Sequence, residues 1–148
     1  MRFLGIDYGS KRVGLSLSDE EGSFAFPYKI IKNDLGLVDT VHNICGEEEV
    51  SAIVIGESHN SEGERNKIMG SVEEFKHNLE GELELPIYFE KEFMTTVHAR
   101  ELLKQTGHAG KEINNAKKVV KDKQEQADAS AAALILQRYL DRKNNKDN

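Results

Sequence analysis

The order of the apolar patterns along the chain is the feature that most constrains its fold. Residues 3–7 form a short apolar run and residues 12–18 alternate polar with apolar or glycine residues, so both are predicted as strands joined by a tight turn at Gly9. Residues 24–31 are predicted as a third strand. Pro27 places that strand at a sheet edge, because proline cannot donate a hydrogen bond to a neighbouring strand.

The rest of the chain alternates between helical and strand patterns. Helices are predicted over 35–45, 64–79, 95–105 and 124–141, strands over 51–55 and 85–89, and a long polar loop over 107–123. The first three strands form an antiparallel meander, and strands reached through helices run parallel to the first. We therefore expect an α/β fold, with a five-stranded mixed sheet and helices on both faces. A chain of 148 residues suits one domain, here 1–142, with a frayed tail at 143–148.

Acidic residues stand where the parallel strands of this sheet are predicted to end. Asp7 closes the first strand, and Glu57 and Glu92 follow the two later ones. Because the carboxyl ends of parallel strands meet at one edge, these side chains are expected to lie together. Asp128 is expected to open the last helix and, if the alanines after it pack on the sheet, to face the same edge.

Several carboxylates at one edge repel one another unless a divalent cation neutralises them. Mg²⁺ and Mn²⁺ prefer oxygen ligands, and two such ions can activate a water and stabilise the leaving oxygen of a phosphodiester. We therefore expect Mg²⁺ or Mn²⁺ at Asp7, Glu92, Asp128 and Glu57. A purely structural interpretation stays open, in which Asp7 caps a turn and Asp128 complements a helix dipole.

Basic residues that could contact phosphates are unevenly distributed. The net charge is −6, with nine basic against 19 acidic residues in 1–98 but 11 against seven in 99–148. The predicted loop carries a lysine cluster, whose alternative interpretation is a solvated surface. The candidates for nucleic-acid binding are Lys11, Arg65, Lys117, Lys118, Lys121 and Lys123.

Cysteine usage and hydropathy indicate the compartment. Cys45 is the one cysteine, which excludes an internal disulfide and a cysteine-cluster zinc site. No apolar run approaches the ~18 residues of a membrane span, and the first residues run straight into Asp7 rather than forming a signal peptide. We expect a cytoplasmic protein that does not contact membranes. We also expect a monomer or a weak homodimer.

Segments at both ends of the chain and between them resemble one protein family. They are Met1–Asp19 with its Leu-Gly-Ile-Asp-Tyr-Gly-Ser-Lys-Arg-Val-Gly, Ile53–Gly56, Asn60–Gly63, Glu92–Thr96, and Asp128–Asp141 with its Ala-Ala-Ala-Leu-Ile-Leu-Gln. In this order they resemble the motifs of the YqgF/RuvX family of Holliday-junction resolvase-like nucleases. The resemblance covers nearly the whole chain, and the combination is specific although the first motif alone is not.

The resemblance implies an RNase H-like fold and a metal-dependent endonuclease. The implied substrates are structured RNA, namely the 5′ end of precursor 16S rRNA during ribosome biogenesis, or branched DNA, and the ribosomal subunit is an implied partner. By motif match, the family's acidic positions fall on Asp7, Glu92 and Asp128. An alignment that uses Asp122 as the last acid is possible, but Asp128 fits the closing helix without a gap.

This sequence departs from the family pattern around two of its motifs. Lys91 stands where the motif has Asp, and Phe93 stands where it has Arg, so a bidentate phosphate ligand is lost. Glu57 and Ser58 replace a Leu-Pro pair. A second hypothesis is therefore a catalytically weakened nucleic-acid-binding or ribosome-associated module. A third, an actin-like phosphotransferase, ranks last because the chain is too short for two lobes.

Overall fold

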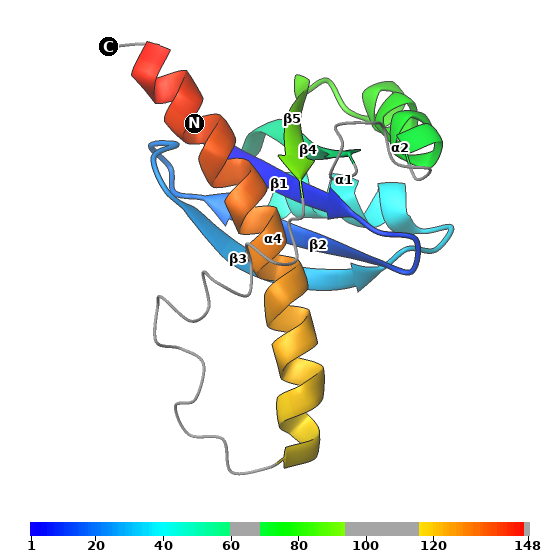
Figure 1. Ribbon diagram of the computed structural model, residues 1–148. Coiled ribbons are helices and arrows are strands. Elements are labelled where there is room, and N and C mark those ends of the chain that lie inside the picture. Colours follow the sequence, from blue (N-terminus) through cyan, green and yellow to red (C-terminus); the bar gives the residue numbers. More distant parts are fainter. Residues whose placement is uncertain (60–68, 94–115, 147–148) are drawn as a thin grey trace.

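The computed structural model describes residues 1–59, 69–93 and 116–146, with side chains through Glu57, from Gly70 to Lys91 and from Ala129 onward. Figure 1 shows the arrangement of its helices and strands. In chain order the elements are β1 (Arg2–Tyr8), β2 (Arg12–Ser18), β3 (Ala25–Lys32), α1 (Leu37–Glu47), β4 (Val50–His59), α2 (Met69–Glu82), β5 (Ile87–Phe93) and α4 (Ala116–Lys146).

The five strands form one mixed sheet in the order β3-β2-β1-β4-β5. Strands β1, β2 and β3 pair antiparallel, while β4 pairs parallel with both β1 and β5. This confirms the predicted meander followed by parallel strands. It also confirms that the strand containing Pro27 lies at an edge of the sheet, where the proline's missing N–H does not interrupt hydrogen bonding between two strands.

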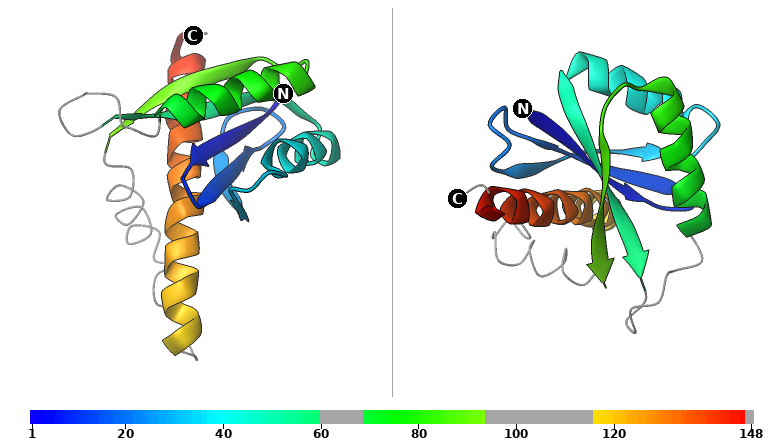
Figure 2. Two further views of the ribbon diagram at one scale, coloured as in Figure 1. Left: turned by 90° about the vertical axis from the view of Figure 1, so that its right-hand side faces the viewer. Right: turned by 90° about the horizontal axis from the view of Figure 1, so that it is seen from above.

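Helices cover both faces of the sheet, as the sequence pattern predicted. In Figure 2, α1 and α2 lie on one face and α4 crosses the other. Alternation along β1 divides the core between these faces, because successive side chains of a strand point to opposite sides. Leu4 and Ile6 pack in the larger core with residues of α1 and α2, whereas Phe3 packs with Leu136 and Leu140 of α4.

Helix α4 begins earlier than the sequence pattern predicted. Residues 116–123 are helical, so the loop prediction over 107–123 is wrong for that stretch, and the helix runs on to Lys146 through the expected tail. The stretch is polar but consists mainly of Lys, Val, Asp and Ala, without Gly or Pro to interrupt a helix. Asp128 consequently lies inside α4 and does not open it.

Two strands extend further than predicted. Strand β4 continues to His59 and β5 to Phe93, because these two strands remain hydrogen-bonded to each other beyond their apolar runs. Glu57 and Glu92 therefore lie within strands rather than after them. The helix predicted at 95–105 lies outside the described residues.

Two further features concern the hydropathy of the helices and the cysteine. No helix in the described part of the chain is long and apolar enough to cross a membrane. The thiol of Cys45 is free and buried, and burial raises its pKa to about 11. That thiol is therefore protonated near neutral pH and is not a nucleophile.

Candidate functional site

The centre of the sheet touches α4 at Gly5. A Cβ on Gly5 would stand 2.8 Å from Leu136 Cβ and 3.0 Å from the carbonyl oxygen of Ala132, and it would meet the Ser16 hydroxyl. That hydroxyl donates a hydrogen bond of 2.8 Å to the same carbonyl oxygen. The absent side chain thus lets α4 approach β1, and Ser16 fixes the helix there.

Helix α4 runs antiparallel to β1 on this face. Phe3, near the start of β1, packs against Tyr139 with ring centroids 5.8 Å apart. Two residues later, Gly5 meets the helix at Leu136 and Ala132. Later residues of β1 therefore contact earlier residues of α4. Asp7, two residues beyond Gly5, is accordingly expected to lie near the N-terminal half of α4.

Asp7 and Asp128 both lie near this contact. Asp7 is half-buried on the face of Gly5, about 7 Å further along β1. The backbone of Asp128 lies one helical turn before Ala132, about 6 Å along α4. The structure therefore brings the backbones of these two residues to the same part of the α4-covered face.

Glu57 belongs to the opposite face of the sheet. In β4 it alternates in step with Ile53 and Ile55, which pack in the core beneath α1 and α2. Its register partner in β5 is Lys91. The sheet thus separates Glu57 from Asp7, although both were expected at one edge.

Glu92 occupies a position on the α4-covered face, but further along the sheet. It pairs in register with Ser58 and follows the alternation of Tyr88 and Glu90, which contact α4. Pairing between β1 and β4 ends at Ile55, so Glu92 lies on a two-stranded ribbon that extends beyond β1. The backbone does not place it beside Asp7.

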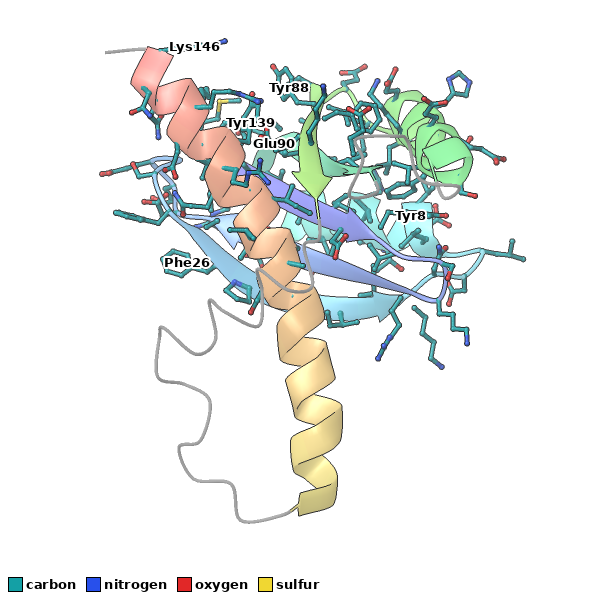
Figure 3. All side chains as sticks on the ribbon, viewed as in Figure 1. Tyr8, Phe26, Tyr88, Glu90, Tyr139 and Lys146 are labelled. Atoms are coloured by element: carbon teal, nitrogen blue, oxygen red, sulfur yellow. The ribbon has the colours of Figure 1, made fainter. Side chains whose placement is uncertain are left out.

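Glu90 is a buried carboxylate that sequence reasoning did not select. Its side chain is 5% exposed and forms an ion pair of 2.5 Å between Oε2 and Nη2 of Arg142, while Oε1 accepts a 3.3 Å hydrogen bond from Nη1. Tyr88 and Tyr139 stack beside this pair, with centroids 5.4 Å apart (Figure 3). Burial, with smaller contributions from Tyr88 and Glu90, raises the pKa of the Tyr139 hydroxyl. The sequence signal that could have pointed to Glu90 was the alternation of residues 87–92, because it assigns Glu90 to the same face of β5 as Tyr88 and Glu92.

The ion pair between Glu90 and Arg142 is expected to hold β5 against α4. Arg142→Met should lower the free energy of unfolding by about 1–3 kcal/mol, because it leaves a carboxylate buried without its cation. Glu90→Gln in the same chain should recover much of the loss. Urea unfolding measures both variants. Glu80→Gln, which removes the exposed pair with Lys76, is the control and should change stability by less than about 0.5 kcal/mol.

The predicted phosphate-binding residues are spread over three segments. Lys11 is exposed in the turn between β1 and β2. Lys117, Lys118, Lys121 and Lys123 lie on the first turns of α4, and Arg65 lies outside the described residues. Among the side chains that the structure describes, no group of three or more His, Cys, Asp or Glu gathers closely enough to hold a metal ion.

The chain matches known proteins over nearly its whole length. Residues 1–142 match the family described as "RuvX: Holliday junction resolvase". A "Putative pre-16S rRNA nuclease" of Pelagibacter ubique (strain HTCC1062) is 33% identical over 147 residues, which are 98% of this chain and 91% of the relative. A protein of the same name from Maridesulfovibrio salexigens is 32% identical over 144 residues, 96% of this chain and 99% of the relative.

Solved structures of two resolvases share the fold. Fowlpox virus resolvase, solved with Holliday junction DNA, has a TM-score of 0.58 at 9% identity, covering 96% of this chain and 98% of its own. T. thermophilus RuvC, solved with a Holliday junction substrate, has a TM-score of 0.55 at 19% identity, covering 95% and 93%. These likenesses establish an RNase H-like fold, as expected. Because the family match spans 1–142 and relatives align across almost the whole chain, the protein belongs to the RuvX family.

Proposed function

We propose that this protein is a divalent-metal-dependent endonuclease that hydrolyses phosphodiester bonds in structured RNA. The names of its relatives point to the precursor of 16S rRNA, and we propose its 5′ end as the site of cleavage. The observation that carries the proposal is the placement of Asp7 and Asp128 around the contact between Gly5 and Ala132. The backbone of Asp7 lies one strand repeat beyond Gly5, and that of Asp128 lies about one helical turn before Ala132.

Asp7 and Asp128 are the proposed holders of the metal, and Glu92, the third acid by motif match, would have to approach them from the β4–β5 ribbon. All three offer carboxylate oxygens, which is the donor chemistry that Mg²⁺ and Mn²⁺ prefer. When bound, the metal would supply an activated water and stabilise the charge that develops on the leaving oxygen. The half-buried position of Asp7 limits water around its carboxylate, which strengthens its attraction for a cation.

The proposed nucleic-acid contacts come from more than one segment of the chain. Lys11 extends from the turn after β1, and the four lysines of 117–123 lie on the part of α4 that precedes Asp128. Together with Arg65 they would hold phosphates, and such contacts position a strand without reading its sequence. The free thiol of Cys45 fits a reducing cytoplasm, where we propose that the protein acts, with the ribosomal subunit as its partner.

Cleavage of two substrates tests the proposed function. Purified protein is incubated with a transcript that spans the 5′ end of 16S rRNA and with a four-way DNA junction, each with Mg²⁺, Mn²⁺ or EDTA. We expect site-specific cleavage of the transcript with either metal and none with EDTA. Cleavage of the junction alone would transfer the proposal to branched DNA, and cleavage that persists in EDTA would overturn metal dependence.

A non-catalytic module of the same fold is the second candidate. Lys91 and Phe93 flank Glu92, and the ribbon that carries Glu92 extends beyond the end of β1. If Glu92 stays away from Asp7, two carboxylates remain for the metal and binding weakens. Nucleic-acid binding without cleavage, with either metal present, would favour this candidate.

A further inference from the structure

An open groove lies between the C-terminal ends of α1 and α2. Its volume of about 590 Å³ is within the range of about 300–1,000 Å³ that is usual for ligand sites. It is lined by residues within 42–50 and by 82–85. Val50 begins β4 and Leu85 precedes β5, so the groove lies at the end of the sheet where the parallel strands start. Asp7 lies near the other end of β1, and α4 covers the opposite face (Figure 2), so the groove is separate from the candidate site.

The floor of the groove is apolar. Cys45 and Val50 are buried there. Leu83 and Leu85 are half-buried and pack against the core beneath α1 and α2. Because both leucines also line the groove, the part of their surface that stays exposed is available to an apolar group of a ligand.

The carboxylates that line the groove lack cations to balance them. Glu47, Glu82 and Glu84 are exposed and have no ion-pair partner among the residues that the structure describes. None of the described lining residues is a lysine or an arginine. The neighbouring Glu48 differs, because its carboxylate lies 3.6 Å from the guanidinium of Arg2. The three glutamates of the groove thus carry charge that the fold itself does not neutralise.

Both helices that border the groove end with acidic residues. Helix α1 ends at Glu47 and α2 ends at Glu82, and neither has a basic residue in its last turn. The carbonyl groups at a helix C-terminus carry a partial negative charge, which favours cations and disfavours acids there. Side chains and backbone therefore both make the groove negative, so it attracts cations and repels the phosphates of nucleic acid.

We propose that this groove binds a basic peptide segment of a partner protein. An aliphatic side chain of the segment lies against Leu83 and Leu85, and lysine or arginine side chains beside it pair with the three glutamates. The charge of the groove disfavours nucleic acid as its occupant, and an inorganic cation would leave the apolar floor unused. Because the groove and Asp7 lie at opposite ends of the sheet, the bound segment leaves the candidate site open.

Fluorescence anisotropy with a labelled peptide of repeating Lys-Leu-Lys units tests the proposal. A second peptide has serine in place of each leucine, so it has the same charge without the apolar group. At low salt, in EDTA and without RNA, the leucine peptide should bind at least about tenfold more tightly, because a leucine side chain leaves water on binding. Added KCl should weaken its binding, since the pairs with the glutamates are exposed to solvent.

A pair of double variants locates the binding surface. Glu82→Gln combined with Glu84→Gln removes two charges from the groove and should weaken binding of the leucine peptide several-fold. Glu21→Gln combined with Glu74→Gln removes two exposed charges that lie outside the groove, and it should leave binding unchanged. All four side chains are exposed, so neither double variant should unfold the protein.

A substitution at Gly46 tests the groove without removing an acid. Gly46 lines the groove in the last turn of α1, and nothing lies within 4 Å of a Cβ added there. Gly46→Lys brings the charge of the proposed segment to the helix C-terminus, so peptide binding should fall several-fold while the melting temperature stays equal or rises. Gly46→Ala is the control and should bind the peptide as the wild type does.

Three results would overturn the inference. They are equal binding of the two peptides, equal binding by the two double variants, and displacement of the peptide by spermine at the same concentration of charge, which would assign the groove to a small polycation. Sedimentation velocity of the protein alone adds a fourth, since a dimer that Gly46→Lys dissociates would assign the groove to a second copy. None of these measurements uses cleavage, so the proposed function stands or fails separately.

Discussion

Replacing Asp7 with Asn is expected to lower metal-dependent cleavage more than about 100-fold while leaving the fold intact. The amide keeps the size of the side chain but removes the negative charge that holds a divalent cation. The effect should fall on kcat, because the RNA is bound largely through basic residues elsewhere. Single-turnover cleavage of the precursor transcript measures the loss, and Asp128→Asn should reproduce it.

Glu57→Gln is the matched control for this prediction. It makes the same chemical change on the neighbouring strand, but Glu57 shares the face of Ile55 and not that of Asp7. Cleavage by Glu57→Gln should stay within about threefold of wild type. A loss as large as that of Asp7→Asn would show that the cation is held from the other face, and the proposed site would be wrong.

Stability without metal separates the catalytic from the purely structural role of Asp7. If its carboxylate holds a cation, removing the charge relieves repulsion from nearby acids, and thermal stability without metal should stay equal or rise. A capping carboxylate would behave in the opposite way, with a loss of about 0.5–2 kcal/mol and no change in cleavage. Added Mn²⁺ should raise the melting temperature of the wild type and not that of Asp7→Asn.

The antiparallel meander and its edge strand could be predicted because the residues of each strand indicate how that strand is buried. The alternation of 12–18 marks a strand with one polar face, and Pro27 marks an edge. The continuous apolar run of 51–55 marks a strand covered on both faces, and it lies between β1 and β5. These are local properties, so no knowledge of distant contacts was needed.

The site was harder to predict because it depends on where strands stop. Glu57 was expected at the open edge since the apolar run ends at Ile55, yet β4 continues for four residues beyond that run. Pairing with β5 satisfies the backbone of these polar residues, so hydropathy does not mark the end of the strand. Alternation then assigns Glu57 to the face opposite Asp7. The pairing of Glu90 with Arg142 joins residues 52 positions apart, and no local pattern reveals it.

Gly5→Ala is expected to destabilise the protein by about 2–4 kcal/mol, although it adds a single methyl group. The new Cβ would stand 2.8 Å from Leu136 Cβ and 3.0 Å from the Ala132 carbonyl oxygen, closer than van der Waals contact allows. Part of the loss is overpacking, which typically costs about 1–3 kcal/mol. The rest follows from Ser16, whose hydroxyl meets the same methyl and would give up its hydrogen bond to Ala132 at a cost of about 1 kcal/mol.

Gly46→Ala is the control that isolates close packing from the general effect of replacing glycine. Gly46 lies exposed in α1 with nothing within 4 Å of an added Cβ, so alanine should raise stability by about 0.5–1 kcal/mol. Opposite signs for the two substitutions, measured by urea unfolding, are the expected result. Gly5→Ala should also lower cleavage, because moving α4 from β1 separates Asp128 from Asp7. If Gly5→Ala matches wild type in both stability and cleavage, α4 does not rest on β1 at this point, and the placement of Asp128 beside Asp7 loses its structural basis.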